Sequence, residues 1–120
     1  MDHRVSAAIS IMHRQLTDRV SILRLSRSVN LSSSRLRQLF KQDTGRSPME
    51  YLTELRLERA AELLRSTFLS VKEVTALSGI RDASHFARRF KRQYGLTPSE
   101  FHLRKRALPR APIPGDKSSE

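Results

Sequence analysis

The chain contains one pattern twice, as LRQLFKQDTGRSPMEY at residues 36–51 and as FARRFKRQYGLTPSEF at residues 86–101. The two copies share five of their sixteen positions, among them a phenylalanine followed by a lysine. In both, a glycine follows the basic segment, and Ser-Pro or Thr-Pro then precedes a glutamate. Such a glycine is a typical helix stop, and Ser or Thr followed by Pro and Glu is a typical helix start. The sequence therefore predicts a basic helix, a short turn and a new helix, twice.

Three helices are predicted up to the first of these glycines. The first uses apolar residues at spacings of three and four, and ends near the last of them: Val5, Ala8, Ile9, Met12 and Leu16. The second runs from about Ile22 to Ser28, and Asn30 after it tolerates a left-handed turn. The third begins after Ser32 as its N-cap.

The second half of the chain repeats this arrangement. Ser47 opens a long helix that reaches about Arg65, and Ser70 opens the helix after it. Gly79 occupies the turn position that Asn30 holds in the first half of the chain. Asp82 begins the basic helix of the second copy. No segment shows a strand-like alternation over more than a few residues. The predicted fold class is therefore all-α, with about seven helices.

Each half places a short helix, a turn of about four residues and a basic helix in succession, which is the helix-turn-helix arrangement. We expect two helix-turn-helix subdomains joined by a long central helix. Residues 1–46 hold the opening helix and the first subdomain, and 47–66 form the central linker helix. Residues 67–106 hold the second subdomain and the last helix. Residues 107–120 carry three prolines and no apolar period, and are predicted to be a disordered tail.

The composition favours a polyanionic partner. Lys and Arg number 23 against 12 Asp and Glu, for a net charge of +11. The cations are concentrated in the two copies of the pattern, whereas the predicted central helix carries four glutamates, at Glu50, Glu54, Glu58 and Glu62. Double-stranded DNA fits this distribution best. The absence of cysteine excludes disulfides and thiolate metal sites and fits a cytoplasmic protein, and the N-terminus has no continuous apolar run to predict a membrane segment.

No catalytic, metal or cofactor site is indicated. The histidines lack the spacing of metal ligands, at His3, His13, His85 and His102. No serine lies on a strand-turn-helix elbow, and no glycine-rich phosphate loop is present. We therefore do not expect an enzyme.

Three segments together resemble the DNA-binding domain of the AraC/XylS family of bacterial transcription regulators. They are SGIRDASHFARRFKRQYGLTPSEF at 78–101, RLERAAELL at 56–64 and LFKQDTGRSPMEYL at 39–52, and the resemblance covers roughly residues 5–104. It implies a nucleoid-associated activator that recruits RNA polymerase. Family members usually carry a separate sensing or dimerisation domain, which these residues do not include, so the chain is either an excised fragment or a stand-alone short member. No small-molecule effector is expected within this chain.

Three residues depart from the family pattern, the first of them Arg24, which replaces the acidic partner of the Ser21 cap. Ser26 and Thr75 stand where such domains commonly place alanine at a close helix crossing. Small hydroxyls fit such a position by donating to a carbonyl one turn earlier. We therefore expect the departures to affect local stability more than function.

In a helix-turn-helix, outward side chains early on the second helix contact bases, and flanking cations contact phosphates. Arg37 suits guanine O6 and N7, and Gln38 suits adenine N6 and N7. The base-contact candidates are Ser34, Arg37, Gln38, Lys41, Ala83, Ser84, Ala87, Arg88 and Arg92. The phosphate-contact candidates are Arg35, Arg46, Arg81, Arg89, Lys91, Arg104, Lys105 and Arg106.

Other notable residues are interpreted as structural. Six aromatic residues fall on faces expected to be buried: Phe40, Tyr51, Phe86, Phe90, Tyr94 and Phe101. Asp82 is interpreted as an N-cap, with a polymerase contact as the alternative that the resemblance suggests.

The function predicted is a sequence-specific regulator that binds duplex DNA as a monomer, with two recognition helices in successive major grooves. The alternative is a basic nucleic-acid-binding or architectural protein without sequence preference. The polar set of Arg37, Gln38 and Arg88 favours the first.

Overall fold

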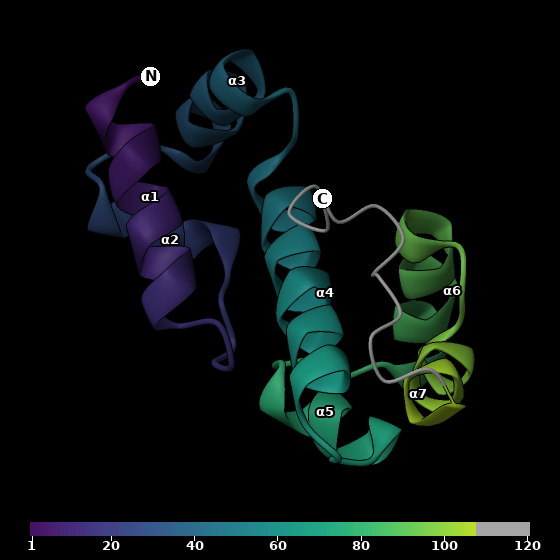
Figure 1. Ribbon diagram of the computed structural model, residues 1–120. Coiled ribbons are helices and arrows are strands. Elements are labelled where there is room, and N and C mark those ends of the chain that lie inside the picture. Colours follow the sequence, from purple (N-terminus) through teal and green to yellow (C-terminus); the bar gives the residue numbers. More distant parts are fainter. Residues whose placement is uncertain (108–120) are drawn as a thin grey trace. The chain divides into compact units, whose positions relative to one another are not determined.

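The computed structural model describes residues 1–107 (Figure 1). Side chains are described as far as Arg104. Its helices are α1 (His3–Arg14), α2 (Ile22–Ser28), α3 (Ser33–Thr44), α4 (Pro48–Ser66), α5 (Val71–Leu77), α6 (Ala83–Tyr94) and α7 (Pro98–Ala107). The described part has no strand, so the all-α prediction is confirmed. The predicted tail lies outside the described residues except for Ala107, which ends α7. Within residues 1–107, no helix combines the length and apolar character needed to cross a membrane.

The chain forms two compact units that divide inside α4, between Leu55 and Arg56. Unit 1 comprises Met1–Leu55, and unit 2 begins at Arg56. The first half of α4 packs into the core of unit 1, and its second half packs into the core of unit 2. The central segment is therefore a continuous helix that takes part in both cores.

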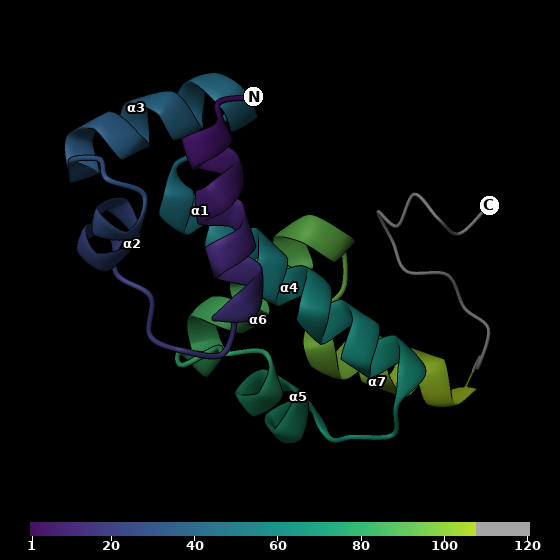
Figure 2. The same ribbon diagram turned by 90° about the vertical axis from the view of Figure 1, so that its left-hand side faces the viewer.

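The core of unit 1 joins α1, α2, α3 and the start of α4, and the first three helices pack on one another (Figure 2). Residues at spacings of three and four bring one face of each helix inward. The buried members are Val5, Ala8, Met12, Leu25, Val29, Leu36, Leu39, Phe40 and Leu52. Phe40 is fully buried and meets Tyr51 edge to face, with ring centroids 5.3 Å apart. The repeated phenylalanine thus anchors the basic helix to the core.

Unit 2 uses the same anchor with more aromatic rings. Phe90 is fully buried. The centroid of its ring lies 5.6 Å from that of Phe86, 4.8 Å from that of Tyr94 and 5.6 Å from that of Phe101. Phe101 meets Phe90 edge to face, as Tyr51 meets Phe40 in unit 1. The helix α7 packs on both α5 and α6. The aromatic residues predicted as core anchors are buried, apart from Tyr51, which is half-buried.

Helix ends follow local sequence, with one difference. Gly45 and Gly95 end α3 and α6 in the left-handed region, at φ 78° and 80°. Ser70 and Glu73 form the full capping box of α5. The helix α1 ends at Arg14 and not near Leu16, because the backbone leaves the helical conformation at residue 15 (ψ 29°). Leu16 still packs against the core from the following loop, which explains why its apolar spacing suggested a longer helix.

Candidate nucleic-acid interface

In unit 1, a tight turn joins α2 to α3. Asn30 adopts the left-handed conformation at φ 60°, and the Leu31 N–H donates to the Ser26 carbonyl at 2.9 Å. The Ser26 hydroxyl donates to the Leu23 carbonyl at 2.9 Å and lies 3.2 Å from the Ser33 hydroxyl. Ser26 therefore closes the turn through its backbone while its buried hydroxyl keeps a partner.

Unit 2 builds the same turn with different side chains. Gly79 takes the left-handed position at φ 77°, and the Ile80 N–H donates to the Thr75 carbonyl at 3.2 Å. The Thr75 hydroxyl donates to the Val71 carbonyl one turn earlier, at 2.7 Å. The expectation that the hydroxyls at the two alanine positions bond back to the helix is confirmed for both Ser26 and Thr75.

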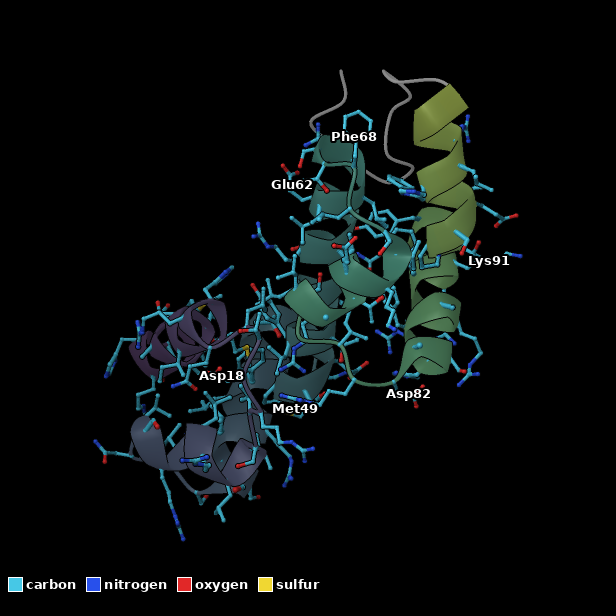
Figure 3. The ribbon with its side chains drawn as sticks, turned by 90° about the horizontal axis from the view of Figure 1, so that it is seen from below. Asp18, Met49, Glu62, Phe68, Asp82 and Lys91 are labelled. Atoms are coloured by element: carbon cyan, nitrogen blue, oxygen red, sulfur yellow. The ribbon has the colours of Figure 1, made fainter. Side chains whose placement is uncertain are left out.

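Side-chain caps begin both helices that follow the turns. The Ser32 hydroxyl accepts from the Arg35 N–H at 3.0 Å, and an Asp82 carboxylate oxygen accepts from the His85 N–H at 3.0 Å. The backbone bond from His85 is the main cause that lowers the pKa of Asp82. Asp82 thus caps α6, as predicted, and lies exposed at its start (Figure 3). These caps hold the first turns of α3 and α6. The two helices together carry most of the candidate contacts.

The outer face of α3 carries all four of its base-contact candidates. Ser34, Arg37, Gln38 and Lys41 are exposed, while Leu36, Leu39 and Phe40 are buried on the opposite face. Arg35, a phosphate-contact candidate, is also exposed, and its guanidinium donates to the Gln38 side-chain carbonyl at 2.9 Å. Two residues to which the sequence assigned separate roles are therefore bonded to each other.

On α6 the candidates differ in how far they face solvent. Ala83, Ser84, Arg88, Lys91 and Arg92 are exposed, as is Arg81 in the preceding turn. Ala87 and Arg89 are half-buried. Arg89 occupies the position equivalent to Leu39, which is 7 % exposed in the core of unit 1. Arg89 is therefore less exposed than Lys91, although a long cationic side chain can bury its stem and keep its guanidinium in water.

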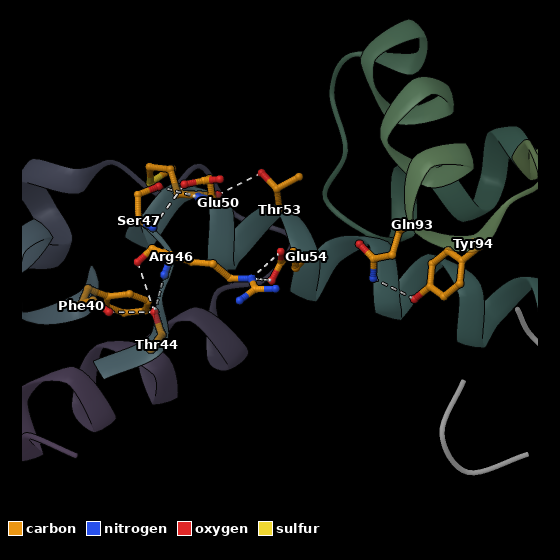
Figure 4. Close-up of polar contacts among 10 residues, drawn as sticks. Phe40, Thr44, Arg46, Ser47, Glu50, Thr53, Glu54, Gln93 and Tyr94 are labelled. Carbon is orange, nitrogen blue, oxygen red and sulfur yellow. Dashed lines mark hydrogen bonds and ion pairs between the residues drawn. The ribbon is translucent and has the colours of Figure 1, made fainter. Parts of the chain in front are cut away.

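The remaining phosphate-contact candidates lie beyond the two recognition helices. The Arg46 guanidinium lies 2.6 Å from a carboxylate oxygen of Glu54, which raises the pKa of Arg46 (Figure 4). Arg46 is therefore ion-paired with a residue of α4. Arg104 is exposed on α7. The side chains of Lys105 and Arg106 lie outside the described residues.

Arg56, which the sequence analysis did not single out, lies close enough to Arg81 to feel its charge. Burial is the main cause that lowers the pKa of Arg56, and the positive charge of Arg81 is the second. Both residues belong to unit 2. No sequence signal pointed to this pair, because Arg56 lies on α4 and meets the turn residue only through the fold.

Comparison with known proteins agrees with the tandem helix-turn-helix geometry. Residues 25–105 match the family model of a helix-turn-helix domain. The crystal structure of a Chromobacterium violaceum regulator, described as containing an AraC-type DNA-binding domain, is 31% identical, with a TM-score of 0.79. The similarity covers 89% of this chain and 95% of that one. The chain belongs to the AraC/XylS family of transcription regulators. The predicted resemblance is thereby confirmed, and this family consists of regulators, not enzymes.

The chain is also similar to a full-length regulator and to an isolated DNA-binding domain. The transcriptional activator RhaR of Mannheimia succiniciproducens is 31% identical over 101 residues, which cover 84% of this chain and 37% of RhaR. The DNA-binding domain of AdpA, crystallised with a target DNA, has a TM-score of 0.82 and 24% identity, over 90% of this chain and 98% of that one, and so shares the fold. The chain spans about a third of the length of the curated relatives that it matches.

Proposed function

We propose that this AraC/XylS domain binds duplex DNA sequence-specifically and inserts α3 and α6 into successive major grooves. One observation carries the proposal: each unit anchors its recognition helix by a buried phenylalanine and leaves a polar, cationic face outward. A helix with such a face fits the width of the major groove. Because one chain holds two such helices, we propose that it binds a bipartite site as a monomer.

We propose that affinity and choice of site come from different residues. Arg37 and Gln38 on α3 and Arg88 on α6 have hydrogen-bonding groups suited to base edges. Ser34, Lys41, Ala83, Ser84, Ala87 and Arg92 complete the base-contact set. The exposed cations Arg81, Lys91 and Arg104 are proposed to contact phosphates, together with Arg35, Arg46, Arg89, Lys105 and Arg106. Phosphate contacts add affinity without sequence information.

We further propose that the bound domain activates transcription by recruiting RNA polymerase, in the cytoplasm at the nucleoid. RhaR, one of the relatives, carries the name of a transcriptional activator. Asp82 is exposed at the start of α6 and is available to a protein partner while it caps the helix.

A second candidate is a basic protein that binds nucleic acid without sequence preference. The net charge of +11 favours it, since neutralising phosphates needs no base contacts. Selection of bound duplexes from a random pool separates the two functions. The sequence-specific proposal expects a recovered bipartite site with half-sites about 10 base pairs apart. Recovery of unrelated sequences with equal affinity would favour the second candidate.

A further inference from the structure

The bond between Arg35 and Gln38 sets the first recognition helix apart from the second. The Arg35 Nη1 donates to the Gln38 Oε1 at 2.9 Å, across one turn of α3. Both side chains are exposed, so the pair lies on the surface that α3 would present to DNA. In unit 2 the equivalent positions hold His85 and Arg88, which both donate hydrogen bonds when charged.

Local structure fixes the backbone at both partners of the bond. The Ser32 hydroxyl caps α3 through the Arg35 N–H at 3.0 Å, which fixes the backbone at the start of the helix. Leu36 and Phe40, both fully buried, fix which side of α3 faces outward. The guanidinium of Arg35 therefore approaches Gln38 along the surface of the helix, from the preceding turn.

This approach decides which half of the Gln38 amide is available. A glutamine side chain carries one accepting oxygen and one donating NH2 group. With its oxygen turned toward Arg35, the amide points its NH2 group away from Arg35. Gln38 then offers donors to a partner, and Arg35 adds further donors beside it.

We propose that Arg35 is a positioning residue that presents Gln38 to DNA as a hydrogen-bond donor, so that α3 selects guanine over adenine. In the major groove guanine shows two acceptors, N7 and O6, whereas adenine shows the N7 acceptor and the N6 donor. Two-bond pairing with adenine needs the Gln38 oxygen and NH2 group side by side against the base, whereas the bond from Arg35 takes one of the two lone pairs of that oxygen and turns the oxygen toward Arg35. The proposal rests on the proposed sequence-specific function, and it differs from the adenine contact expected from residue type alone.

The experiment measures binding of the complete chain to a selected duplex and to its single-base variants. The base pair contacted by Gln38 is first located as the one at which Gln38→Ala loses its preference. At that base pair we expect the unaltered chain to favour guanine over adenine by about three- to tenfold, the range of a single hydrogen bond. Arg35→Met keeps the length of the side chain but removes its donors, so the ratio should fall to about one or invert. Arg35→Lys retains a donor and should preserve a guanine preference.

His85→Met is the matched control, since it alters the equivalent position of α6 and should leave this ratio unchanged. Thermal melting of each variant verifies folding, which an exposed side chain should not alter. Equal loss of affinity for guanine and adenine duplexes in Arg35→Met would overturn the proposal and leave Arg35 as a phosphate contact. A preference of the unaltered chain for adenine at the Gln38 base pair would also overturn it. Absence of preference at every base pair would instead reject sequence-specific binding itself, and the positioning role with it.

Discussion

Replacing Gly95 by valine should destabilise unit 2 through backbone strain alone. Gly95 ends α6 at φ 80°, where its N–H donates to the Lys91 carbonyl at 2.8 Å. A Cβ built on Gly95 meets no atom within 4 Å, so a side chain there encounters open space. The whole cost is therefore conformational, about 1–2 kcal/mol for an ordinary residue in the left-handed region and at the upper end for a β-branched one.

Urea and thermal unfolding of three variants can separate strain from contact. Gly95→Val should lower the free energy of unfolding by about 1–2 kcal/mol, and Gly95→Ala by about 1 kcal/mol. Gly95→Asn should cost less than either, since asparagine tolerates this conformation. A loss of 1 kcal/mol corresponds to a fall in Tm of about 4–8 °C for a unit of this size. DNA binding measured well below the Tm should change little.

Two results would refute this reasoning. Equal destabilisation by asparagine and valine would mean that bulk, not backbone conformation, sets the cost. Unchanged melting together with abolished DNA binding would make Gly95 a contact residue. Gly45 provides an internal comparison in unit 1, because it has φ 78° and an equally open surrounding.

Three further predictions concern binding and pH. Arg88→Ala should lower the binding free energy on the selected site by about 1–3 kcal/mol and reduce base preference at one or two base pairs. Lys91→Ala should weaken binding to all sequences alike and make the dependence of the log binding constant on log salt concentration shallower by about one unit. DNA titrations at several salt concentrations measure both effects. Sedimentation should find one chain on each minimal bipartite site with half-sites about 10 base pairs apart, and two chains would contradict this. Carboxylates cap three helices: Glu73 at α5, Asp82 at α6 and Glu100 at α7, where Glu100 accepts from the Thr97 N–H at 2.9 Å. Their pKa values lie below the ordinary 4.5, 3.8 and 4.5, so their contribution to stability is complete above those values and is lost as the pH falls through the lower folded-state pKa values. Urea unfolding should therefore give constant midpoints above about pH 6 and falling midpoints below about pH 5, and midpoints that rise on acidification would contradict the assigned caps.

Local sequence determined the helices and most of their ends. The caps at Ser32 and Asp82 and the left-handed turns at Asn30 and Gly79 depend on atoms within a few residues, so composition and spacing suffice to predict them. The buried faces follow for the same reason, because a helix brings residues three and four apart onto one side. The AraC/XylS resemblance rested on these same local patterns.

Tertiary structure decided which candidate cations are free to meet DNA. Arg46 pairs with Glu54 across the turn into α4, and Arg89 is half-buried although its neighbours in sequence are basic. Arg56 meets the charge of Arg81, which lies twenty-five residues later in the sequence. The Arg35 bond to Gln38 is local, yet periodicity alone does not say which end of an amide it engages. Charge and spacing place a side chain on a face of a helix, but its partner and its exposure depend on what the fold brings beside it.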